Sequence, residues 1–583
     1  MEQVQVAIIG AGWHGIAAAK TYQQAYSSQQ IAILDSASSI GGVWAKERIY
    51  SELRTNNVVG SYEFSDFPML EEKFGVRQGQ NIPGHVVHAY FEAYVQRFGL
   101  ENKIHLNCKV ETVEYTQESK WILTMNDGST GKVKVLEASK LIVATGLTSK
   151  PYLPQFDGLE DFIAQSPVLH VRDFALNEEE ILKSKKKTTV LGGSKSAFDV
   201  VYSCAASGTT VDWVIRQSGS GPTWIAPAYV GAFKKLLESF PMTRIFSLVS
   251  PCAWNQDAGV TYTWLHGSWL GRKIVDWFWA LMQADLIKTN RYHDHPETEK
   301  LIPWASPFWV ATSLGILNYP TDFFDLVRDG KVRVHVADID KLARGRICLS
   351  SQQQIDSDIL ICCTGWKETP GIKFLPSDIN DKLGFPNSPD ITSPQLREKV
   401  NQLILHQFPR LQLQPSFNRR DIHERHPIRL ARFMAPPTML QERSIVFLGH
   451  TVTLNTAIVA EVQALWAAAY LNNEFPASSP FGKMMGGGGA KYANDILFET
   501  SMHTEFGRWR SPGACGDHCY PNFVFDIIPY IDMLLRDLGI STRRKSSFLA
   551  HWFESHGVRD YSGLTTEWRM AITSRERTNM EKS

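Results

Sequence analysis

The feature that most constrains the fold is a short glycine motif near the amino terminus. The sequence GAGWHG follows the apolar run VQVAIIG and precedes the small-residue stretch IAAAK. In a strand–turn–helix unit, Gly10 allows the tight turn, Gly12 lets the backbone approach a pyrophosphate and Gly15 lets the helix pack on the strand. Asp35 ends the next predicted strand, where a carboxylate can bind a ribose 2′-hydroxyl. We therefore expect an α/β fold that binds a dinucleotide at the start of the chain.

A weaker copy of this unit lies further along, in TTVLGGSKSAFDVV. Serine and alanine replace the second and third glycines there, and Arg216 ends the next predicted strand, where a NAD site usually carries a carboxylate. A planar, permanently charged guanidinium suits the 2′-phosphate of NADPH. The motif alone could be a structural turn, and Arg216 could be an ordinary surface residue. We predict an NADPH site formed by Gly192, Gly193, Ser194, Lys195, Ser196, Ala197 and Arg216.

The composition sets limits on the class of protein. A chain of 583 residues is too long for one core, so two or three domains are expected. The net charge is zero, and nothing indicates a nucleic acid or an anionic membrane as an electrostatic partner. Eight scattered cysteines fit reduced thiols and a cytoplasmic location.

Two further classes of site are not expected. No apolar run reaches the ~18–20 residues of a membrane-spanning helix. The segment CGDHC places Cys515, His518 and Cys519 close together, but this spacing is not that of a zinc module, and we predict no metal site.

Three other segments indicate a family. SIGGVW (39–44), YSELRTN (50–56) and SIVFLGHTVTLNTAIVAEVQALW (444–466), together with the two loops, resemble the flavin-containing monooxygenases, which are class B flavoprotein monooxygenases. The resemblance covers about residues 4–470. It implies two Rossmann-like dinucleotide-binding domains, as in glutathione reductase, with FAD as the first nucleotide. By this resemblance the FAD-binding residues are Gly10, Gly12, Trp13, His14, Gly15, Asp35, Gly41, Gly42, Val43, Trp44, Asn56, Val110, Ala144, Thr145 and Gly146.

The same resemblance divides the chain. A strand at 444–449 and a helix at about 456–471 are expected to return to the FAD domain. KMMGGGGAK (483–491) is expected to be a flexible joint before a helical, mostly polar carboxyl-terminal piece. The predicted parts are 1–165 (FAD domain, first part), 166–355 (NADPH domain, with an aromatic-rich helical insertion at 224–318), 356–475 (FAD domain, second part) and 476–583 (helical extension). ATG (144–146) and CTGW (363–366) are the predicted crossings between the two domains.

The resemblance also implies the chemistry. NADPH would reduce FAD, and the reduced flavin would activate O₂ as a peroxyflavin that oxygenates a small-molecule substrate. Asn56 matches the family's asparagine beside the flavin and is our predicted catalytic residue, with Asn57 as the competing position. The family's linker motif is F-x-G-x-x-x-H with an aromatic residue four positions later. This chain has His170 and Phe174, but Phe162 lies too far before His170 and Ala164 replaces the glycine. We therefore interpret His170 as a linker or structural residue rather than a proton donor.

Several alternatives stay open at this point. A disulfide reductase is disfavoured because no cysteine precedes Cys108. The chain lacks the NRYPGARCD-like segment of typical Baeyer–Villiger enzymes, which favours the flavin-containing monooxygenase branch without excluding Baeyer–Villiger chemistry or epoxidation. The predicted reaction is heteroatom oxidation, hydroxylation or epoxidation of a bulky apolar small molecule. A flavin reductase or oxidase without substrate oxygenation, and a catalytically silent nucleotide-binding protein, are further alternatives.

The aromatic insertion bears on the substrate. Its large aromatic side chains would either line a pocket for a bulky apolar molecule or form the insertion's own core. Examples are Trp264, Trp269, Trp277, Phe278, Trp304 and Trp309. The carboxyl-terminal sequence resembles that of fungal family members that tailor secondary metabolites. The sequence indicates no particular oligomeric state.

Overall fold

The structure of the chain is a computed structural model. It describes residues 2–231, 234–255, 257, 259–309, 314–367, 369–386, 388–416, 426–487, 489–512 and 520–580.

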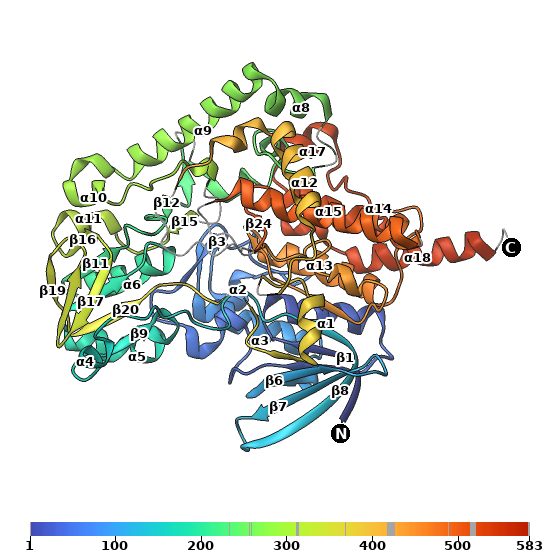
Figure 1. Cartoon of the computed structure of the whole chain (residues 1–583), viewed down its shortest axis with the longest axis horizontal. Coiled ribbons are helices and arrows are strands. Elements are labelled where there is room, and N and C mark those ends of the chain that lie inside the picture. The colour runs from blue at the N-terminus through green and yellow to red at the C-terminus, as the bar shows by residue number, and fades with distance from the viewer. Residues whose placement is uncertain are drawn as a thin grey trace.

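The amino-terminal glycine motif joins the first strand to the first helix of the larger sheet. Strand β1 (Glu2–Ile9) leads into helix α1 (Trp13–Ala25), and β2 (Ile31–Leu34) returns parallel to β1. The sheet has the order β21-β6-β7-β8-β1-β2-β5, and β22 pairs in parallel with β8. The other strands are β5 (Ile104–His105), β6 (Cys108–Tyr115), β7 (Trp121–Asp127), β8 (Lys132–Val143), β21 (Lys373–Leu375) and β22 (Ile445–Phe447). Segments far apart in the chain therefore build one nucleotide-binding sheet, seen at the bottom of Figure 1.

The second glycine loop belongs to a separate parallel sheet. Its order is β16-β11-β10-β20-β9, and the loop joins β10 to helix α6 (Lys195–Ala206). The strands are β9 (Val168–His170), β10 (Thr188–Leu191), β11 (Val211–Ile215), β16 (Val332–Val336) and β20 (Ile359–Cys362). An antiparallel meander, β17 (Ile339–Ala343), β18 (Arg346–Leu349) and β19 (Gln354–Asp356), lies at its edge (Figure 1). The chain thus has two dinucleotide-binding folds, as the sequence predicts.

The two segments that link the sheets lie side by side. The amide of Tyr152 donates to the carbonyl of Gly365 at 3.1 Å, and the amide of Lys367 donates to the carbonyl of Lys150 at 2.8 Å. Pro151 and Trp366 form the antiparallel bridge between them. The two linker segments are therefore hydrogen-bonded to each other, and this pairing connects the two sheets.

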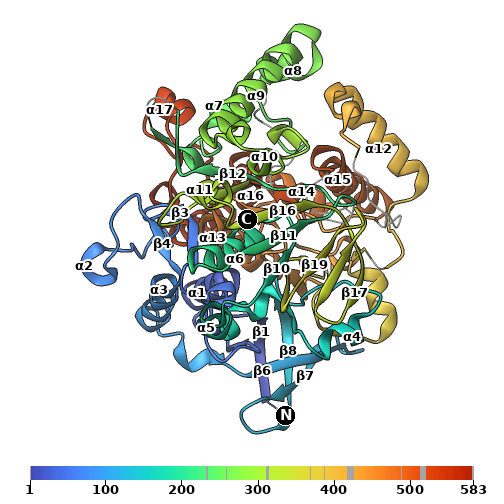
Figure 2. The same cartoon turned by 90° about the vertical axis from the view of Figure 1, so that its left-hand side faces the viewer.

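The insertion in the second fold is mainly helical. Its base is closed by β12 (Trp224–Pro227), which pairs in parallel with β15 (Leu314–Leu317). Between these strands lie α7 (Arg244–Ser247), α8 (Gly259–Gly267), α9 (Trp269–Thr289) and α10 (Pro296–Glu299). Figures 1 and 2 show α8 and α9 as an arm along one edge of the molecule.

The carboxyl-terminal helices pack on the first fold and are less polar than the sequence suggested. Helix α13 (Thr456–Leu471) contacts α16 (Ile527–Leu538), in which every side chain except that of Arg536 is buried. β24 (Asn522–Phe523) also pairs with β23 (Val452–Thr453). The remaining helices are α14 (Pro480–Gly486), α15 (Gly489–Arg510), α17 (Phe548–Phe553) and α18 (Leu564–Met580). The expectation of a mostly polar extension is wrong for α16, because α16 completes the core around α13.

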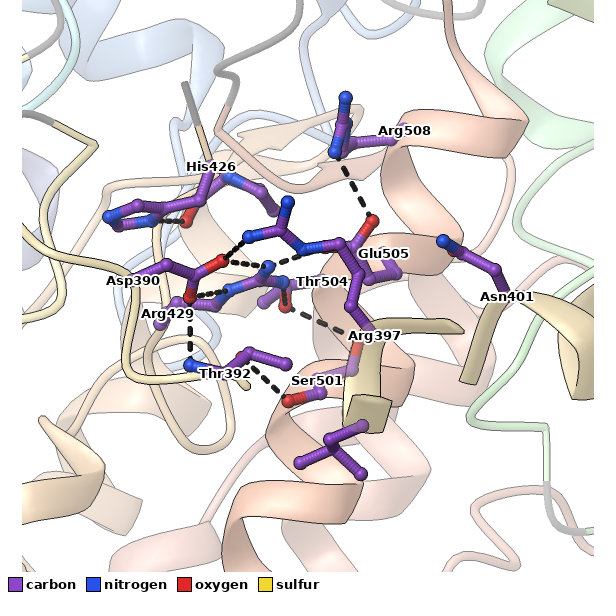
Figure 3. A network of polar contacts seen from close by, with 12 residues as sticks. Asp390, Thr392, Arg397, Asn401, His426, Arg429, Ser501, Thr504, Glu505 and Arg508 are labelled. Carbon is purple, nitrogen blue, oxygen red and sulfur yellow. Dashed lines mark hydrogen bonds and ion pairs between the residues drawn. The ribbon is translucent and has the colours of Figure 1, made fainter. Parts of the chain in front are cut away.

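A buried polar network secures the long helix α15 (Figure 3). Arg429 is fully buried; it donates to Asp390 at 2.9 Å and to the Thr504 hydroxyl at 2.6 Å, and it pairs with Glu505. Burial opposes ionisation of Asp390, but the hydrogen bond and charge of Arg429 hold the pKa of this carboxyl well below its usual value. The extension is therefore tied to the first fold by charge as well as by apolar packing.

Candidate functional site

A large cavity lies over the first glycine loop. Its volume is about 710 Å³, within the range of small-molecule and cofactor sites. It is lined by most of the predicted FAD-binding residues: Gly10, Gly12, Trp13, His14, Asp35, Gly41, Gly42, Val43, Val110, Ala144, Thr145 and Gly146. Gly15, Trp44 and Asn56 are not among the lining residues.

The glycines of the first loop have different roles. Gly10 has a φ of +113°, and a Cβ atom on it would lie 2.4 Å from the carbonyl oxygen of Ala144. A Cβ atom on Gly15 would lie 1.8 Å from the carbonyl oxygen of Gly10, so Gly15 packs behind the turn and not in the cavity. Gly12 has room on the protein side, because the nearest atom to its Cβ would be Gly42 Cα at 3.6 Å. The loop thus presents bare backbone and the amino end of α1 to the cavity, a geometry suited to a pyrophosphate.

Asp35 is fixed at one end of the cavity. Its carboxylate accepts hydrogen bonds from the amides of Ala11 at 2.7 Å and Ala37 at 2.9 Å. Burial raises the pKa of Asp35, and the two amides oppose this rise. The carboxylate keeps further lone pairs for a ribose hydroxyl, the role that its position after β2 predicts.

The cavity contains polar atoms that need a ligand. Thr145 Oγ1, Thr451 Oγ1, Thr453 Oγ1 and His14 Nε2 are buried, and none has a hydrogen-bond partner within the part of the chain that the structure describes. Buried polar groups in folded proteins are rarely left unpaired. The hydroxyls, phosphates and ring edge of FAD offer the donors and acceptors that these atoms lack. The residues present therefore fit the flavin cofactor.

Two arginines, Arg48 and Arg172, line this cavity and were missed by the sequence analysis. Arg48 lies 5.2 Å from the Trp366 ring, and its Nη2 donates to the Thr148 hydroxyl at 3.3 Å. Burial and then the charge of Arg172 lower the pKa of Arg48 to about 10. Neither arginine has an acidic partner within 4.0 Å among the described residues. Two guanidinium groups on one cavity favour a polyanionic ligand such as a dinucleotide. Arg172 stands within the linker sequence LHVRDF, but no sequence signal marked Arg48.

Trp44 supports the cavity from behind. Its Nε1 donates to the hydroxyl of Tyr62 at 3.1 Å, and Tyr62 lines the cavity. Trp44 itself is only 8% exposed.

The two candidate asparagines differ in their surroundings. Both lie on β3 (Arg54–Val58), where Asn56 is exposed and Asn57 is buried. The Asn57 amide donates to Glu238 and to the carbonyl of Leu454 at 2.9 Å. Burial raises the pKa of Glu238, and the hydrogen bonds from Ser61 and Asn57 oppose the rise. Asn57 is thus committed to protein contacts, whereas the Asn56 side chain remains accessible.

The second glycine loop keeps the turn of the first one. Gly192 has a φ of +138°, and a Cβ atom on it would lie 2.4 Å from the carbonyl oxygen of Cys363. A Cβ atom on Gly193 would lie 2.5 Å from the carbonyl oxygen of Gly221. Ser194 is exposed at the start of α6, Ser196 is partly exposed, and Ala197 is buried. The strand-to-helix turn therefore forms even though only its first two positions are glycine.

Arg216 and Lys195 point to different environments. Arg216 is exposed immediately after β11, and it forms no ion pair with any described residue. Lys195 instead pairs with Asp199 and donates to Tyr319 OH at 3.1 Å and to Asn318. Burial lowers the pKa of Lys195, and Asp199 opposes this effect. The ammonium expected at the phosphate loop is thus engaged within the protein, because a buried charge needs a partner.

His170 occupies the linker position that the sequence indicated. It is 1% exposed; its Nε2 lies 2.9 Å from the carbonyl oxygen of Gly365, and its Nδ1 accepts from the Arg172 amide at 3.1 Å. Burial lowers the pKa of His170. Both ring nitrogens are therefore used to hold the linker.

The aromatic insertion does not form the expected pocket wall along its length. Trp264, Trp269 and Trp277 are 42%, 68% and 65% exposed, whereas Trp309 is buried and Phe278 packs against the core. Trp304 is 40% exposed and lies against Gly221 beside the second loop. The idea that the first three tryptophans enclose a substrate is wrong, because their rings face outward.

Two predicted absences concern the described residues only. None of the helices described is long and apolar enough to cross a membrane. No group of three or more metal-ligating side chains occurs in the described segments, and Cys515, His518 and Cys519 lie outside them.

Comparison with known proteins tests the resemblance. The pyridine nucleotide-disulphide oxidoreductase family matches residues 7–248. The chain is 33% identical to an FAD-dependent monooxygenase of Pyrenophora dematioidea, over 93% of this chain and 99% of that protein. It is also 33% identical to the FAD-dependent monooxygenase resA of Aspergillus sclerotiorum, over 97% of each chain.

Solved structures agree in fold. Closed cyclohexanone monooxygenase matches with a TM-score of 0.57 at 15% identity, over 98% of both chains. The S-allyl-L-cysteine S-oxygenase of Allium sativum matches with a TM-score of 0.52 at 15% identity, over 100% of this chain and 99% of that one. The predicted family, fold class and flavin cofactor are confirmed. With a cavity of about 710 Å³ over its first glycine loop and relatives that match almost end to end, this chain belongs to the FAD-dependent monooxygenases.

Proposed function

We propose that this monooxygenase takes its electrons from NADPH and uses O₂ to oxygenate a bulky apolar small molecule. The observation that carries the proposal is the pair of nucleotide folds with opposite charges at the ribose position: Asp35 after β2 and Arg216 after β11. A carboxylate suits a ribose 2′-hydroxyl, and a guanidinium suits a 2′-phosphate. The two folds therefore fit two different nucleotides.

The residues of the first fold would hold FAD. The backbone of Gly10 and Gly12 and the amino end of α1 would bind the pyrophosphate, with Arg48 and Arg172 supplying positive charge nearby. Asp35 would bind the adenosine ribose. Bound flavin supplies the redox chemistry, since it accepts a hydride from a nicotinamide and passes electrons to O₂. The protein supplies position and a pocket with limited access to water.

The second fold would hold NADPH. Gly192, Gly193, Ser194 and Ser196 would surround the phosphates at the start of α6, and Arg216 would bind the 2′-phosphate. Lys195 would act indirectly, because its partner Asn318 donates to the carbonyls of Arg54 and Thr55, both at 3.1 Å. These contacts connect the NADPH loop to the strand that carries Asn56. We retain Asn56 as the proposed catalytic residue, because its side chain is exposed and forms no hydrogen bond with any described residue.

The proposal assigns the parts of the chain as follows. Residues 1–165 and 363–475 form the FAD domain, 166–362 the NADPH domain, and 476–583 the helical extension. The boundary expected at 355/356 moves to 362/363, because β20 (Ile359–Cys362) pairs with β10 and β9 in the second sheet. The fungal origin of the two relatives and the carboxyl-terminal resemblance support a role in secondary-metabolite biosynthesis, with small molecules and not nucleic acids as partners. We place the reaction in the cytoplasm. The oxygenated atom is a heteroatom or carbon, with a Baeyer–Villiger reaction as the second candidate because of the fold shared with cyclohexanone monooxygenase.

The ratio of H₂O₂ released to NADPH consumed distinguishes a monooxygenase from a simple reductase or oxidase. The purified yellow protein is mixed with NADPH or NADH in air, and NADPH consumed is compared with H₂O₂ released, with and without a panel of bulky apolar molecules. We expect the flavin absorbance to bleach at a much lower concentration of NADPH than of NADH. When a substrate is present, we expect the amount of H₂O₂ released per NADPH consumed to fall. Stoichiometric H₂O₂ under every condition would contradict monooxygenation, and equal use of both nicotinamides would contradict the NADPH assignment.

A further inference from the structure

The outward face of α9 is apolar although it is open to solvent. Trp269, Leu270, Ile274, Trp277 and Leu281 are 68%, 54%, 42%, 65% and 49% exposed. They recur at the spacing of one helix face, while the opposite face carries the buried residues that hold α9 to the protein. Single exposed apolar residues are common, but a contiguous row of large ones marks an interaction surface.

Neighbouring elements also carry exposed apolar side chains. Phe246 of α7 contacts Phe278 of α9, with ring centroids 5.9 Å apart, and α17 packs on α7. Both views of the molecule place α8, α9 and α17 at the same upper rim (Figures 1 and 2). Six more exposed apolar side chains lie on these elements: Ile245, Val260, Trp264, Phe548, Leu549 and Phe553. We call these six and the five on α9 the apolar ridge.

The charges beside the ridge are predominantly basic. Arg272, Lys273 and Arg543 border it, and none of them has an acidic partner within 4.0 Å among the described residues. Among the neighbouring acids, Asp276 pairs with Arg410 and Asp257 pairs with Arg536. Asp285 on α9 and Glu554 after α17 have no basic partner within 4.0 Å among the described residues, but Lys288 on α9 adds a fourth base without an acidic partner there, so bases outnumber acids. The surroundings of the ridge are therefore positively charged although the whole chain is neutral.

We propose that the apolar ridge binds the surface of an anionic phospholipid membrane and lies in its interfacial layer. Tryptophan and phenylalanine beside basic residues are typical of helices that bury one face at the headgroup boundary. The indole N–H groups and the basic side chains find partners at that depth, and lipid adapts to a protruding arm. Since none of the helices described is suited to span a bilayer, the contact is one of attachment to the surface.

A second copy of the chain is the competing occupant. A twofold interface places the same patch of both subunits together. It would therefore bring together Arg272, Lys273 and Arg543 of two copies, which lack an acidic partner among the described residues, in one apolar contact where like charges repel. An anionic membrane instead neutralises the same three groups.

Vesicle flotation of the full-length, FAD-loaded protein tests the proposal. The vesicles contain phosphatidylcholine alone or phosphatidylcholine with 30% phosphatidylserine, at low and high salt. We expect flotation with the anionic vesicles and weaker flotation at high salt. Absence from both vesicle fractions would overturn the proposal, and equal flotation with both lipids would overturn its electrostatic part.

Variants locate the contact. Trp269→Ser with Trp277→Ser should reduce the partition into vesicles roughly 100-fold, because each large apolar side chain withdrawn from lipid forfeits several-fold to tenfold in affinity. Lys273→Glu with Arg543→Glu should remove the preference for phosphatidylserine. Val133→Ser, at a 64% exposed site on β8 at the opposite end of the molecule, is the matched control and should float as the parent does.

Two results would overturn the proposal at this stage. The first is vesicle binding that survives the double tryptophan substitution. The second is a dimer, seen by light scattering without lipid, that this substitution abolishes while no lipid binding is found. Flavin absorbance and thermal unfolding of each variant verify that it is folded, and the tryptophans are exposed, so folding should be retained.

Discussion

Arg432 and Asp537 form an ion pair that is entirely buried. Arg432 Nε donates to Asp537 Oδ2 at 2.6 Å, and Nη2 donates to Oδ1 at 3.2 Å. Asp537 also accepts from the Trp466 indole and from the amide of Phe481, both at 3.1 Å. One carboxylate thus joins α16 to α13, to α14 and to the segment before β22.

Breaking this pair should destabilise the whole flavin-side fold. We expect Asp537→Asn to lower the free energy of unfolding by about 3–5 kcal/mol, because Arg432 is left as an under-compensated buried charge. Chemical denaturation followed by tryptophan fluorescence measures the change. Arg77→Ala removes a pair whose side chains are 75% and 58% exposed, and as the control it should cost less than about 1 kcal/mol. Equal effects of the two substitutions would refute the assignment of Asp537 as a core contact.

Alanine at two glycines of the first loop should have different effects. Gly12→Ala should leave the thermal midpoint nearly unchanged, because the atom nearest to its Cβ would be Gly42 Cα at an ordinary 3.6 Å. The methyl group would nevertheless stand where the pyrophosphate is expected to bind. Gly10→Ala should lower both stability and flavin content, because its Cβ would collide with the Ala144 carbonyl. The flavin-to-protein absorbance ratio and the melting curve separate the two cases. A Gly12→Ala protein with full flavin content would contradict this placement.

Arg216 should determine nicotinamide choice. We expect Arg216→Ala to raise the KM for NADPH roughly 10- to 100-fold, since hydrogen bonds to charged groups are worth about 1.5–3 kcal/mol. The KM for NADH should change little, because NADH carries no 2′-phosphate. Steady-state flavin reduction with each cofactor gives the comparison, and Arg344→Ala on the edge meander serves as a surface control. A parallel rise in both constants would assign Arg216 to another role.

Glu461 should make stability depend on pH. Burial, opposed by Lys20, raises the pKa of Glu461 from 4.5 to about 7, and its carboxyl accepts from Ser65. The native state therefore retains a proton between pH 4.5 and 7 that the unfolded chain has released. This contribution to stability is present at low pH and is lost as the pH rises through 7.

The pH dependence of stability is compared between the parent protein and the Glu461→Gln variant, which cannot titrate at this position. Relative to this variant, the parent should lose up to about 3 kcal/mol of unfolding free energy between pH 5 and 8. Denaturant titrations of both proteins over this range measure the difference. Parallel profiles for parent and variant would show that Glu461 does not titrate in this window.

The neighbouring asparagines can be separated by substitution. Asn57→Ala should lower stability by about 1–3 kcal/mol, because it removes the donor to the Leu454 carbonyl and one of the buried donors to Glu238, which keeps Ser61 and Val58. Asn56→Ala should leave the melting curve unchanged and increase the H₂O₂ released per NADPH, if Asn56 acts at the flavin as proposed. Unchanged peroxide release in Asn56→Ala, alongside increased release in a folded Asn57→Ala, would transfer the role to Asn57.

Much of the architecture follows from short stretches of sequence. Each of the turns, at Gly10 and at Gly192, lies within its own strand–turn–helix unit, and Asp35 follows the first of these units. The spacing of residues within a unit is therefore enough to predict them. Helix α13 was expected at about 456–471 and is found at Thr456–Leu471, because an almost entirely apolar run and the N-cap Asn455 define it locally.

Other features depend on contacts between distant parts of the chain. Arg48 and Arg172 meet on one cavity, and Lys195 turns to Asp199 and Asn318 instead of the phosphate loop. Periodicity indicates which residues share a helix face, but not what covers that face, so it could not tell that Trp277 lies in solvent while Trp279 is buried. The sequence by itself determined the two nucleotide folds, because their turns are governed by local backbone geometry. Only the tertiary structure decided which charges pair and which apolar faces stay open, because both depend on where distant elements pack.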